Sequence, residues 1–181
     1  MNKPTVVSLF SGAGGMDLGF IKAGYEILWA NDFFAEAVET YKKNVNKNIV
    51  YGDITKIKNE DIPDNPDVII GGFPCQGFSI ANNNRSMKDE RNFLYKELLR
   101  VIDNKKPKFF VVENVKGLLS MGKGKIIKMI IPAMVKIYCP PICTYNLSAT
   151  VKYIFSDFFH SYRYRYSRIK CRASARPRRR R

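Results

Sequence analysis

The sequence predicts an α/β fold with a Rossmann-like parallel sheet, and two observations support this prediction. Short apolar segments alternate along the chain with segments whose apolar residues recur at helical spacing. The first unit runs from an apolar strand through a glycine turn into a helix, which is typical of nucleotide-binding βα units. We expect strands near residues 5–10, 26–31, 48–51, 67–71 and 109–113, and helices near 16–24, 34–44, 92–103 and 120–131.

The first strand leads into Ser11 and the glycine turn Gly12-Ala13-Gly14-Gly15. Asp32 follows the second strand, about 20 residues after the first glycine, where an acidic side chain can bind ribose hydroxyls. The two features together predict a nucleoside cofactor. Glycine turns also serve tight packing, and this pattern does not separate a nicotinamide dinucleotide from S-adenosylmethionine.

Two reactive side chains follow later strands of the expected sheet. Cys75 lies on a glycine- and proline-containing loop directly after the strand near residues 67–71, a position from which a thiol can act as a nucleophile. Glu113 ends the strand near residues 109–113, so its carboxyl group can lie at the same edge of the sheet. Taken singly, Cys75 is better explained as a small buried residue in a turn, and Glu113 as a solvated charge at a strand end.

Three motifs in this order resemble the cytosine-5 DNA methyltransferases. They are Phe10-Ser11-Gly12-Ala13-Gly14-Gly15, Gly72-Phe73-Pro74-Cys75-Gln76 and Glu113-Asn114-Val115. The resemblance covers residues 4 to 131 and implies a Rossmann-like S-adenosylmethionine-dependent methyltransferase domain that is incomplete. It implies S-adenosylmethionine as cofactor, double-stranded DNA with a flipped cytosine as substrate, and a place in a restriction-modification system.

The resemblance also assigns roles to individual residues. The catalytic residues are Cys75 and Glu113. The residues expected to bind the cofactor are Phe10, Ser11, Gly12, Ala13, Gly14, Gly15, Asp32, Phe33, Asp53, Ile54, Pro74 and Leu94. Those expected to bind the substrate are Gln76, Ser79 and Asn114. Phe33 would stack on adenine, although an aromatic residue after a buried strand is more often part of the core.

The chemistry explains why these residue types occur together. Carbon 5 of cytosine is a weak nucleophile, so a thiolate, here Cys75, must first add to carbon 6. The carboxyl group of Glu113 would disperse the resulting charge at ring nitrogen 3. Because the target atom is inaccessible in a stacked duplex, the base must be flipped out of the helix. The same chemistry serves cytosine in RNA, which is the less favoured substrate.

Composition narrows the remaining function classes. Hydrophobic residues make up 45% of the 181 residues, and no apolar run is long enough to span a membrane. No signal peptide is visible, so we expect a cytoplasmic protein without a membrane partner. The four cysteines lack the paired spacing of zinc sites and there is one histidine, so we expect no metal.

The net charge of +15 is unevenly distributed. Residues 1–131 contain 19 basic and 15 acidic side chains, whereas residues 132–181 contain 12 basic side chains and one acidic. Pro132 is expected to end or kink the helix near 120–131. We therefore expect two parts: a partial S-adenosylmethionine-binding catalytic domain, 1–131, and a basic C-terminal tail, 132–181, that is disordered or unrelated to the family.

The later motifs of the resembling family are not recognisable in residues 132–181. The alternative to an active methyltransferase is therefore an inactive truncated remnant, or one piece of a split methylase. A split enzyme would need a complementary polypeptide for target recognition. The recognised DNA sequence and the oligomeric state do not follow from the residues.

Overall fold

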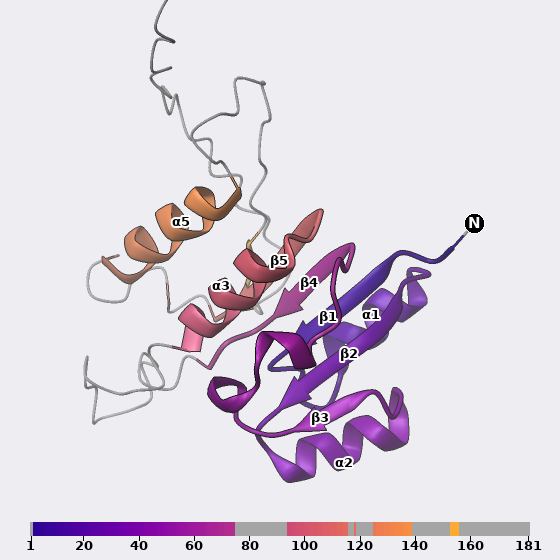
Figure 1. The fold of residues 1–181 in the computed structure, drawn as a ribbon. Coiled ribbons are helices and arrows are strands. Elements are labelled where there is room, and N and C mark those ends of the chain that lie inside the picture. The colour runs from indigo at the N-terminus through magenta and orange to yellow at the C-terminus, as the bar shows by residue number, and fades with distance from the viewer. Residues whose placement is uncertain (1, 75–93, 116–117, 119–124, 139–152, 156–181) are drawn as a thin grey trace, which may run out of the picture.

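A computed structural model shows a parallel β-sheet covered by helices (Figure 1). It describes residues 2–74, 94–115, 118, 125–138 and 153–155. The strands are β1 (Thr5–Leu9), β2 (Glu26–Asp32), β3 (Ile49–Tyr51), β4 (Val68–Gly71), β5 (Phe109–Asn114) and β6 (Tyr153–Phe155). The helices are α1 (Gly15–Lys22), α2 (Ala35–Asn44), α3 (Leu94–Lys105) and α5 (Lys125–Tyr138), with short 3₁₀ helices η1 (Ile54–Lys56) and η2 (Asn59–Asp61).

The described strands pair in the order β3-β2-β1-β4-β5-β6, and every pair is parallel. This order reverses its direction between β1 and β4, so the connections that leave these two strands diverge. Ligands of doubly wound α/β proteins bind at the carboxyl ends of the strands near such a reversal. The predicted Rossmann-like α/β class is therefore confirmed, with five of the strands close to their predicted ranges.

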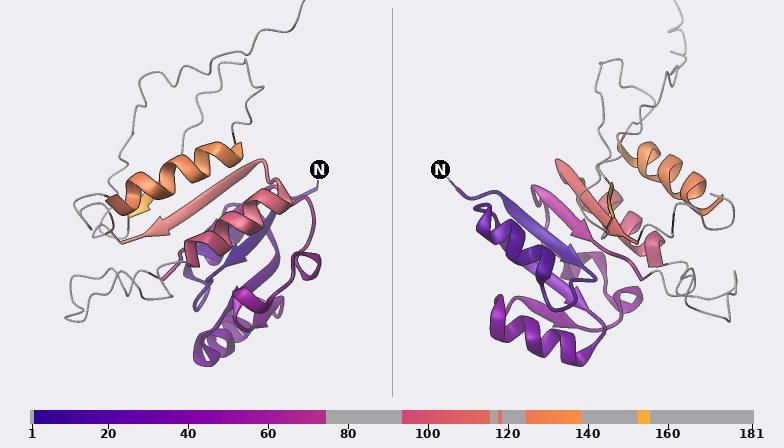
Figure 2. Two further views of the ribbon diagram at one scale, coloured as in Figure 1. Left: turned by 60° about the vertical axis from the view of Figure 1, so that its left-hand side comes forward. Right: turned by 180° about the vertical axis from the view of Figure 1, so that it is seen from behind.

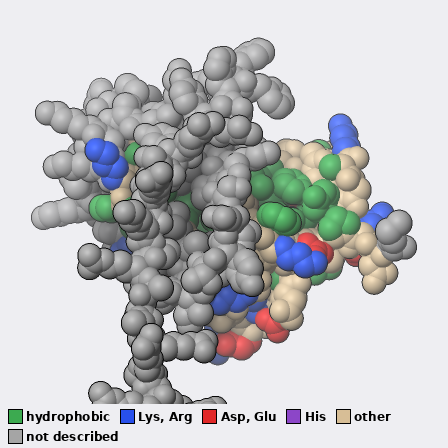
Figure 3. Space-filling model, turned by 90° about the horizontal axis from the view of Figure 1, so that it is seen from above, with side chains coloured by type: hydrophobic (Ala, Val, Ile, Leu, Met, Phe, Trp, Pro, Cys, Tyr) green, Lys and Arg blue, Asp and Glu red, His purple; other side chains and the backbone are tan. Residues whose placement is uncertain are grey.

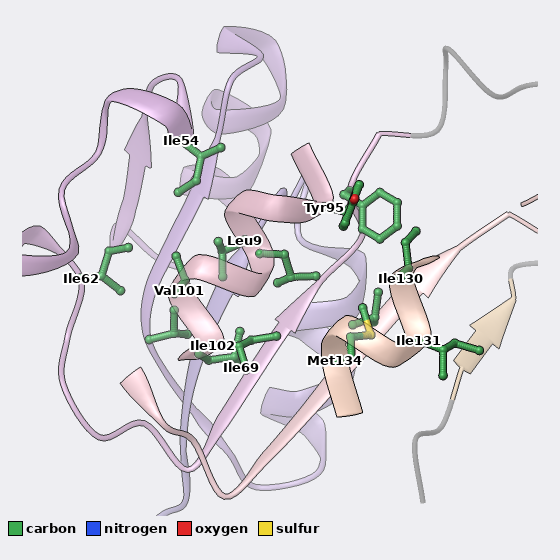
Figure 4. Packing of buried hydrophobic residues seen from close by; sticks show 14 of the residues in the cluster. Leu9, Ile54, Ile62, Ile69, Tyr95, Val101, Ile102, Ile130, Ile131 and Met134 are labelled. Carbon is green, nitrogen blue, oxygen red and sulfur yellow. The ribbon is translucent and has the colours of Figure 1, made fainter. Parts of the chain in front are cut away.

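Each face of the sheet has its own apolar core, because successive strand residues point to opposite faces. In β1, Val6 packs with the residues of α1 and α2, whereas Val7 and Leu9 pack with those of α3 and α5. The view from behind in Figure 2 brings α1 and α2 in front of the sheet. Figure 4 shows the opposite core, in which Ile69 of β4 lies close to side chains of α3 and α5.

Helix α5 differs from its predicted range. The predicted end at residue 131 is wrong, because the helix continues through Pro132 to Tyr138. Four buried residues at helical spacing, Ile127, Ile130, Ile131 and Met134, form an apolar stripe that spans the proline. A proline inside a helix costs about 3 kcal/mol, and burying aliphatic side chains offsets this by about 1.5–3 kcal/mol each.

Strand β6 was not predicted, since the expected tail begins before it. It pairs in parallel with β5, so that Glu113 lies opposite Ile154. Residues 139–152 and 156–181 lie outside the described residues, and with them most of the expected tail. On the face seen in Figure 3, the Lys and Arg side chains of the described part are scattered beside an exposed group of hydrophobic side chains.

A polar clamp ties β1 to β4 at the amino ends of the strands. The carboxylate of Asp67 accepts hydrogen bonds from the backbone N–H of Thr5 at 2.8 Å and from the ammonium group of Lys108 at 2.6 Å. The bond from Lys108, followed by those from Thr5, lowers the pKa of Asp67 to about 2. This clamp lies at the edge of the sheet opposite to the carboxyl ends. Among the described residues, no helix is long and apolar enough to cross a membrane.

Candidate cofactor and catalytic site

The strand register brings the predicted site residues to one edge of the sheet. Leu9 of β1 pairs with Asn31 of β2 and with Gly71 of β4, and Gly71 pairs with Val112 of β5. Leu9, Asn31, Gly71 and Val112 thus lie side by side across four strands. The next residue along the chain from each of them therefore lies at the carboxyl edge of the sheet, beside its counterparts. Those residues are Phe10, Asp32, Gly72 and Glu113; Asp32 is the predicted ribose-binding acid, and the other three belong to the predicted motifs.

The turn after β1 has left-handed backbone at three positions, two of which are glycine. Phe10, Gly12 and Gly14 all have positive φ, 53°, 55° and 91° respectively. A Cβ on Gly14 would lie 2.4 Å from Cγ2 of Val45, whereas one on Gly12 would meet nothing within 4 Å. Gly14 therefore allows close packing behind the turn, and Gly12 leaves space at the turn itself.

Asp32 connects the glycine turn to the end of β2. One carboxylate oxygen accepts a hydrogen bond from the backbone N–H of Gly12 at 2.7 Å, and the other accepts one from that of Phe34 at 2.9 Å. A carboxylate has about four acceptor positions, so Asp32 can accept further hydrogen bonds from two ligand hydroxyls. Asp32 is 7% exposed, and its two hydrogen bonds hold the carboxylate in this orientation.

Two phenylalanines follow Asp32 on the surface. Phe33 is 61% exposed and Phe34 is 56% exposed, and their rings pack edge to face with centroids 5.8 Å apart. Phe33 is thus not a core residue, which was the alternative for it. An exposed aromatic face beside a carboxylate can stack on the adenine of a nucleoside.

The segment after β3 is held by hydrogen bonds from Asn31 of β2 and by a cap within the segment itself. Asn31 donates its side-chain amide hydrogens to the carbonyl oxygens of Val50, at 3.0 Å, and Gly52, at 2.9 Å. Asp53 caps η1 through its carboxylate, which accepts the backbone N–H of Thr55 at 2.9 Å. Ile54 is buried at 3% exposure. The predicted pair Asp53 and Ile54 thus lies beside the end of β2.

Arg100 of α3 braces the same segment and was not predicted from the sequence. One guanidinium nitrogen donates to the carbonyl oxygens of Ile54 and Ile57, both at 3.1 Å. Another donates to the side chain of Asn59, and the third donates to Glu97 at 2.7 Å. Arginine on an amphipathic helix is usually solvated, so the sequence carries no signal for this role.

The residues at the ends of β1, β2 and β3 form the first half of the site, and those at the ends of β4 and β5 form the second half. A Cβ on Gly72 would lie 2.8 Å from Oε2 of Glu113, so the glycine leaves room for this carboxyl group. Asn114 is 4% exposed and donates its side-chain amide to the carbonyl oxygen of Phe73 at 2.9 Å. This bond joins the end of β5 to the backbone that immediately precedes Pro74.

The remaining predicted residues divide into two groups. Ser11, Pro74 and Leu94 are partly buried and Ala13 and Gly15 are exposed, all next to the elements already described. Cys75, Gln76 and Ser79 lie outside the described residues. Within the described ranges, no group of three or more His, Cys, Asp or Glu side chains is arranged to hold a metal ion.

A buried polar cluster behind the glycine turn was also not predicted. Asp17, in the first turn of α1, accepts hydrogen bonds from the hydroxyls of Ser8 at 2.8 Å and Tyr41 at 2.5 Å. Burial raises the pKa of Asp17, although the two hydrogen bonds act in the opposite direction. The pKa of Tyr41 is also raised, by burial and by its hydrogen bond to Asp17. The serine within an otherwise apolar strand was the available sequence signal.

Comparisons with known proteins identify the family of the chain. Residues 4–138 match the family described as C-5 cytosine-specific DNA methylase, seven residues beyond the resemblance seen in the sequence. The chain is 49% identical over 159 residues to the type II methyltransferase M.NgoFVII of Neisseria gonorrhoeae, covering 87% of this chain and 40% of that protein. It is 46% identical to M.FnuDI of Fusobacterium nucleatum, covering 70% of this chain and 36% of the relative.

Two solved structures are similar to the described fold. A candidate DNA modification methyltransferase encoded within an Escherichia coli prophage superposes with a TM-score of 0.60 at 32% identity, over 72% of this chain and 37% of that chain. The Dnmt2 methyltransferase of S. pombe superposes with a TM-score of 0.55 at 24% identity, over 72% and 42% respectively, and shows the fold alone. The chain thus spans about two fifths of the length of these proteins, and it belongs to the C-5 cytosine-specific DNA methylase family.

Proposed function

We propose that this chain transfers a methyl group from S-adenosylmethionine to carbon 5 of cytosine in DNA, as part of a type II restriction-modification system. The observation that carries the proposal is the convergence of Asp32, the glycine turn and Glu113 at one edge of the sheet. Family membership supplies the reaction class. A cytoplasmic location is part of the proposal, because both the methyl donor and the DNA are found there in bacteria.

The residues of the first half of the site fit S-adenosylmethionine. Gly12 leaves open space, Asp32 retains acceptor capacity for ribose hydroxyls, and Phe33 offers an exposed ring for adenine. Asp53 and Ile54 would border the adenine, and Ser11, Pro74 and Leu94 would border the rest of the cofactor. The cofactor, when bound, supplies an electrophilic methyl group.

The residues of the second half would act on the flipped cytosine. Cys75 would supply the thiolate that adds to carbon 6, and Glu113 would hold a proton at ring nitrogen 3. Gln76, Ser79 and Asn114 would contact the substrate. The bond from Asn114 to the carbonyl oxygen of Phe73 supports this arrangement, because it ties the catalytic loop to the strand that carries Glu113.

We also propose that a complementary polypeptide recognises the DNA target, as in a split methylase. The chain covers 40% of M.NgoFVII. We therefore propose assaying the chain alone and together with a polypeptide that contains the other part of this relative. Methyl transfer only in the combined sample would support a split enzyme, and transfer by the chain alone would exclude a need for a second polypeptide.

The test uses S-adenosylmethionine with a radioactive methyl group, duplex DNA, and RNA of the same sequence. We expect label in DNA, no label with Cys75→Ser, and normal transfer with the matched control Cys143→Ser. Duplexes that contain 5-fluorocytosine should form a covalent adduct with the wild-type chain and not with Cys75→Ser. Label in RNA alone, or equal transfer by Cys75→Ser, would contradict the proposal.

A further inference from the structure

The described part of the chain contains one cluster of fully buried polar side chains next to the proposed cofactor site. It consists of Ser8 of β1, Asp17 of α1 and Tyr41 of α2, which are 1%, 0% and 0% exposed. The two hydroxyl groups donate to different oxygens of the Asp17 carboxylate, at 2.8 Å from Ser8 and 2.5 Å from Tyr41. The cluster therefore links one strand and two helices on the same face of the sheet.

Burying this polar cluster costs free energy, and an apolar side chain could fill the same space without that cost. A buried carboxylate is unfavourable unless it is hydrogen bonded, and a phenylalanine at position 41 would fill the same apolar space. Both hydroxyls are directed at Asp17, so each of its oxygens is satisfied. Buried networks of this kind fix one arrangement of the elements that they join.

The element that Tyr41 meets is the glycine turn. A Cβ on Gly14 would lie 2.8 Å from Cδ2 and 3.0 Å from Cε2 of Tyr41, so the ring lies directly against the backbone of Gly14. Gly14 has a φ of 91° and caps α1, whose first turn contains Asp17. The ring of Tyr41 thus contacts the glycine turn at Gly14, and its hydroxyl contacts the first turn of α1 at Asp17.

Helix α2 directly follows Asp32 and Phe33, two residues of the proposed cofactor site. It begins at Ala35, immediately after Phe33 and Phe34, and Phe34 donates its backbone N–H to Asp32. Asp32 in turn accepts the N–H of Gly12. Asp32 therefore joins the glycine turn to the residue that precedes α2, and Tyr41 joins the turn to the body of α2.

We propose that Tyr41 is a positioning residue of the S-adenosylmethionine site, whose hydroxyl, held by Asp17, fixes the glycine turn in the geometry that receives the cofactor. This inference rests on the proposed function for the identity of the ligand. Tyr41 acts through Gly14 and Asp17 and does not touch the ligand itself.

The test compares Tyr41→Phe with Val38→Ala in the full chain. Both residues are buried in α2, but Val38 packs only in the apolar core. Three quantities are measured: the urea midpoint, the affinity for S-adenosylhomocysteine by calorimetry, and the amide chemical shifts of Gly12, Gly14 and Gly15 in ¹⁵N-labelled protein.

Tyr41→Phe should lower the affinity at least about fivefold more than Val38→Ala does, and it should shift the three glycine amides, whereas Val38→Ala leaves them in place. Asp17→Asn should keep affinity within about twofold of wild type, because an amide can accept from Tyr41 and donate to Ser8. Asp17→Leu should lose affinity as Tyr41→Phe does.

Wild-type affinity together with unshifted glycine amides in Tyr41→Phe would overturn the inference and leave the proposed function standing. Wild-type protein that fails to bind S-adenosylhomocysteine would contradict the proposed function instead. The amide shifts, which need no ligand, would still decide whether the Tyr41 hydroxyl positions the turn.

Discussion

Replacement of Gly14 by alanine tests whether the glycine turn depends on close packing. Gly14 has a φ of 91°, a conformation that alanine rarely adopts. Its new Cβ would also lie 2.4 Å from Cγ2 of Val45 and 2.8 Å from Cδ2 of Tyr41. Both distances are far below van der Waals contact, so the turn or α2 must move.

The cost of this substitution is the sum of two effects. An alanine in the left-handed region costs about 1–2 kcal/mol, and overpacking a core costs about 1–3 kcal/mol. The expected loss in the free energy of unfolding is therefore about 2–5 kcal/mol, a large part of the roughly 5–15 kcal/mol of a typical domain. With a urea dependence near 2 kcal/mol per molar, the midpoint should fall by about 1–2.5 M.

Unfolding in urea is followed by the fluorescence of Trp29, the only tryptophan, which is buried in the core. The matched control is Gly19→Ala in α1, where a Cβ would meet nothing within 4 Å. Glycine within a helix is less favourable than alanine by roughly 0.5–1 kcal/mol, so Gly19→Ala should stabilise the protein. An unchanged midpoint for Gly14→Ala, or an equal loss for Gly19→Ala, would refute this reasoning.

Three further predictions concern other parts of the site and sheet. Gly72→Ala should change the urea midpoint little but lower methyl transfer at least about tenfold, because its new Cβ displaces only the Glu113 carboxyl group. In the matched variant Gly71→Ala the new Cβ meets the backbone of Leu9, so the free energy of unfolding should fall by about 1–3 kcal/mol. Folding lowers the pKa of Asp67 to about 2 from 3.8, so its stabilising effect is complete above pH 3.8 and is lost as the pH falls toward 2. Urea midpoints measured between pH 5 and pH 2 should therefore fall more for wild type than for Asp67→Asn, and parallel curves would contradict this. Arg100→Lys should lose both hydrogen bonds to the carbonyl oxygens of Ile54 and Ile57, which should lower the free energy of unfolding by about 1.5–3 kcal/mol. Its affinity for S-adenosylhomocysteine, measured by calorimetry, should fall severalfold. Unchanged values would show that the segment after β3 keeps its conformation without the arginine.

Local patterns in the sequence were sufficient for the strands and for the edge where the site lies. β1, β2 and β4 are short apolar segments with a glycine or an aspartate at the strand end or within three residues of it, and the parallel order then places Asp32 and Glu113 at the same edge of the sheet. The glycine turn was predicted because its residue types are required by its backbone conformation. The confirmed family resemblance rests on the same motifs.

The errors arise where tertiary contacts outweigh local preference. Pro132 predicted an end or a kink of the helix near residue 131, but burial of Ile131 and Met134 on the same face keeps α5 continuous. The pairing of β6 with β5 joins residues about 40 positions apart, which no local pattern indicates. Asp17 and Arg100 are polar residues on helices, where the usual expectation is a solvated face.

The central claim is that the carboxyl edge of β1 and β2 binds S-adenosylmethionine and not a nicotinamide dinucleotide. Calorimetry with S-adenosylhomocysteine and with NAD tests this directly on the wild-type chain. The matched variants are Asp32→Asn, which loses an acceptor at the proposed ribose site, and Asp103→Asn, an exposed residue of α3 away from it. We predict tighter binding of S-adenosylhomocysteine, a loss on the order of 1–3 kcal/mol for Asp32→Asn, and no change for Asp103→Asn. Tighter binding of NAD, or equal affinities in both variants, would contradict the account.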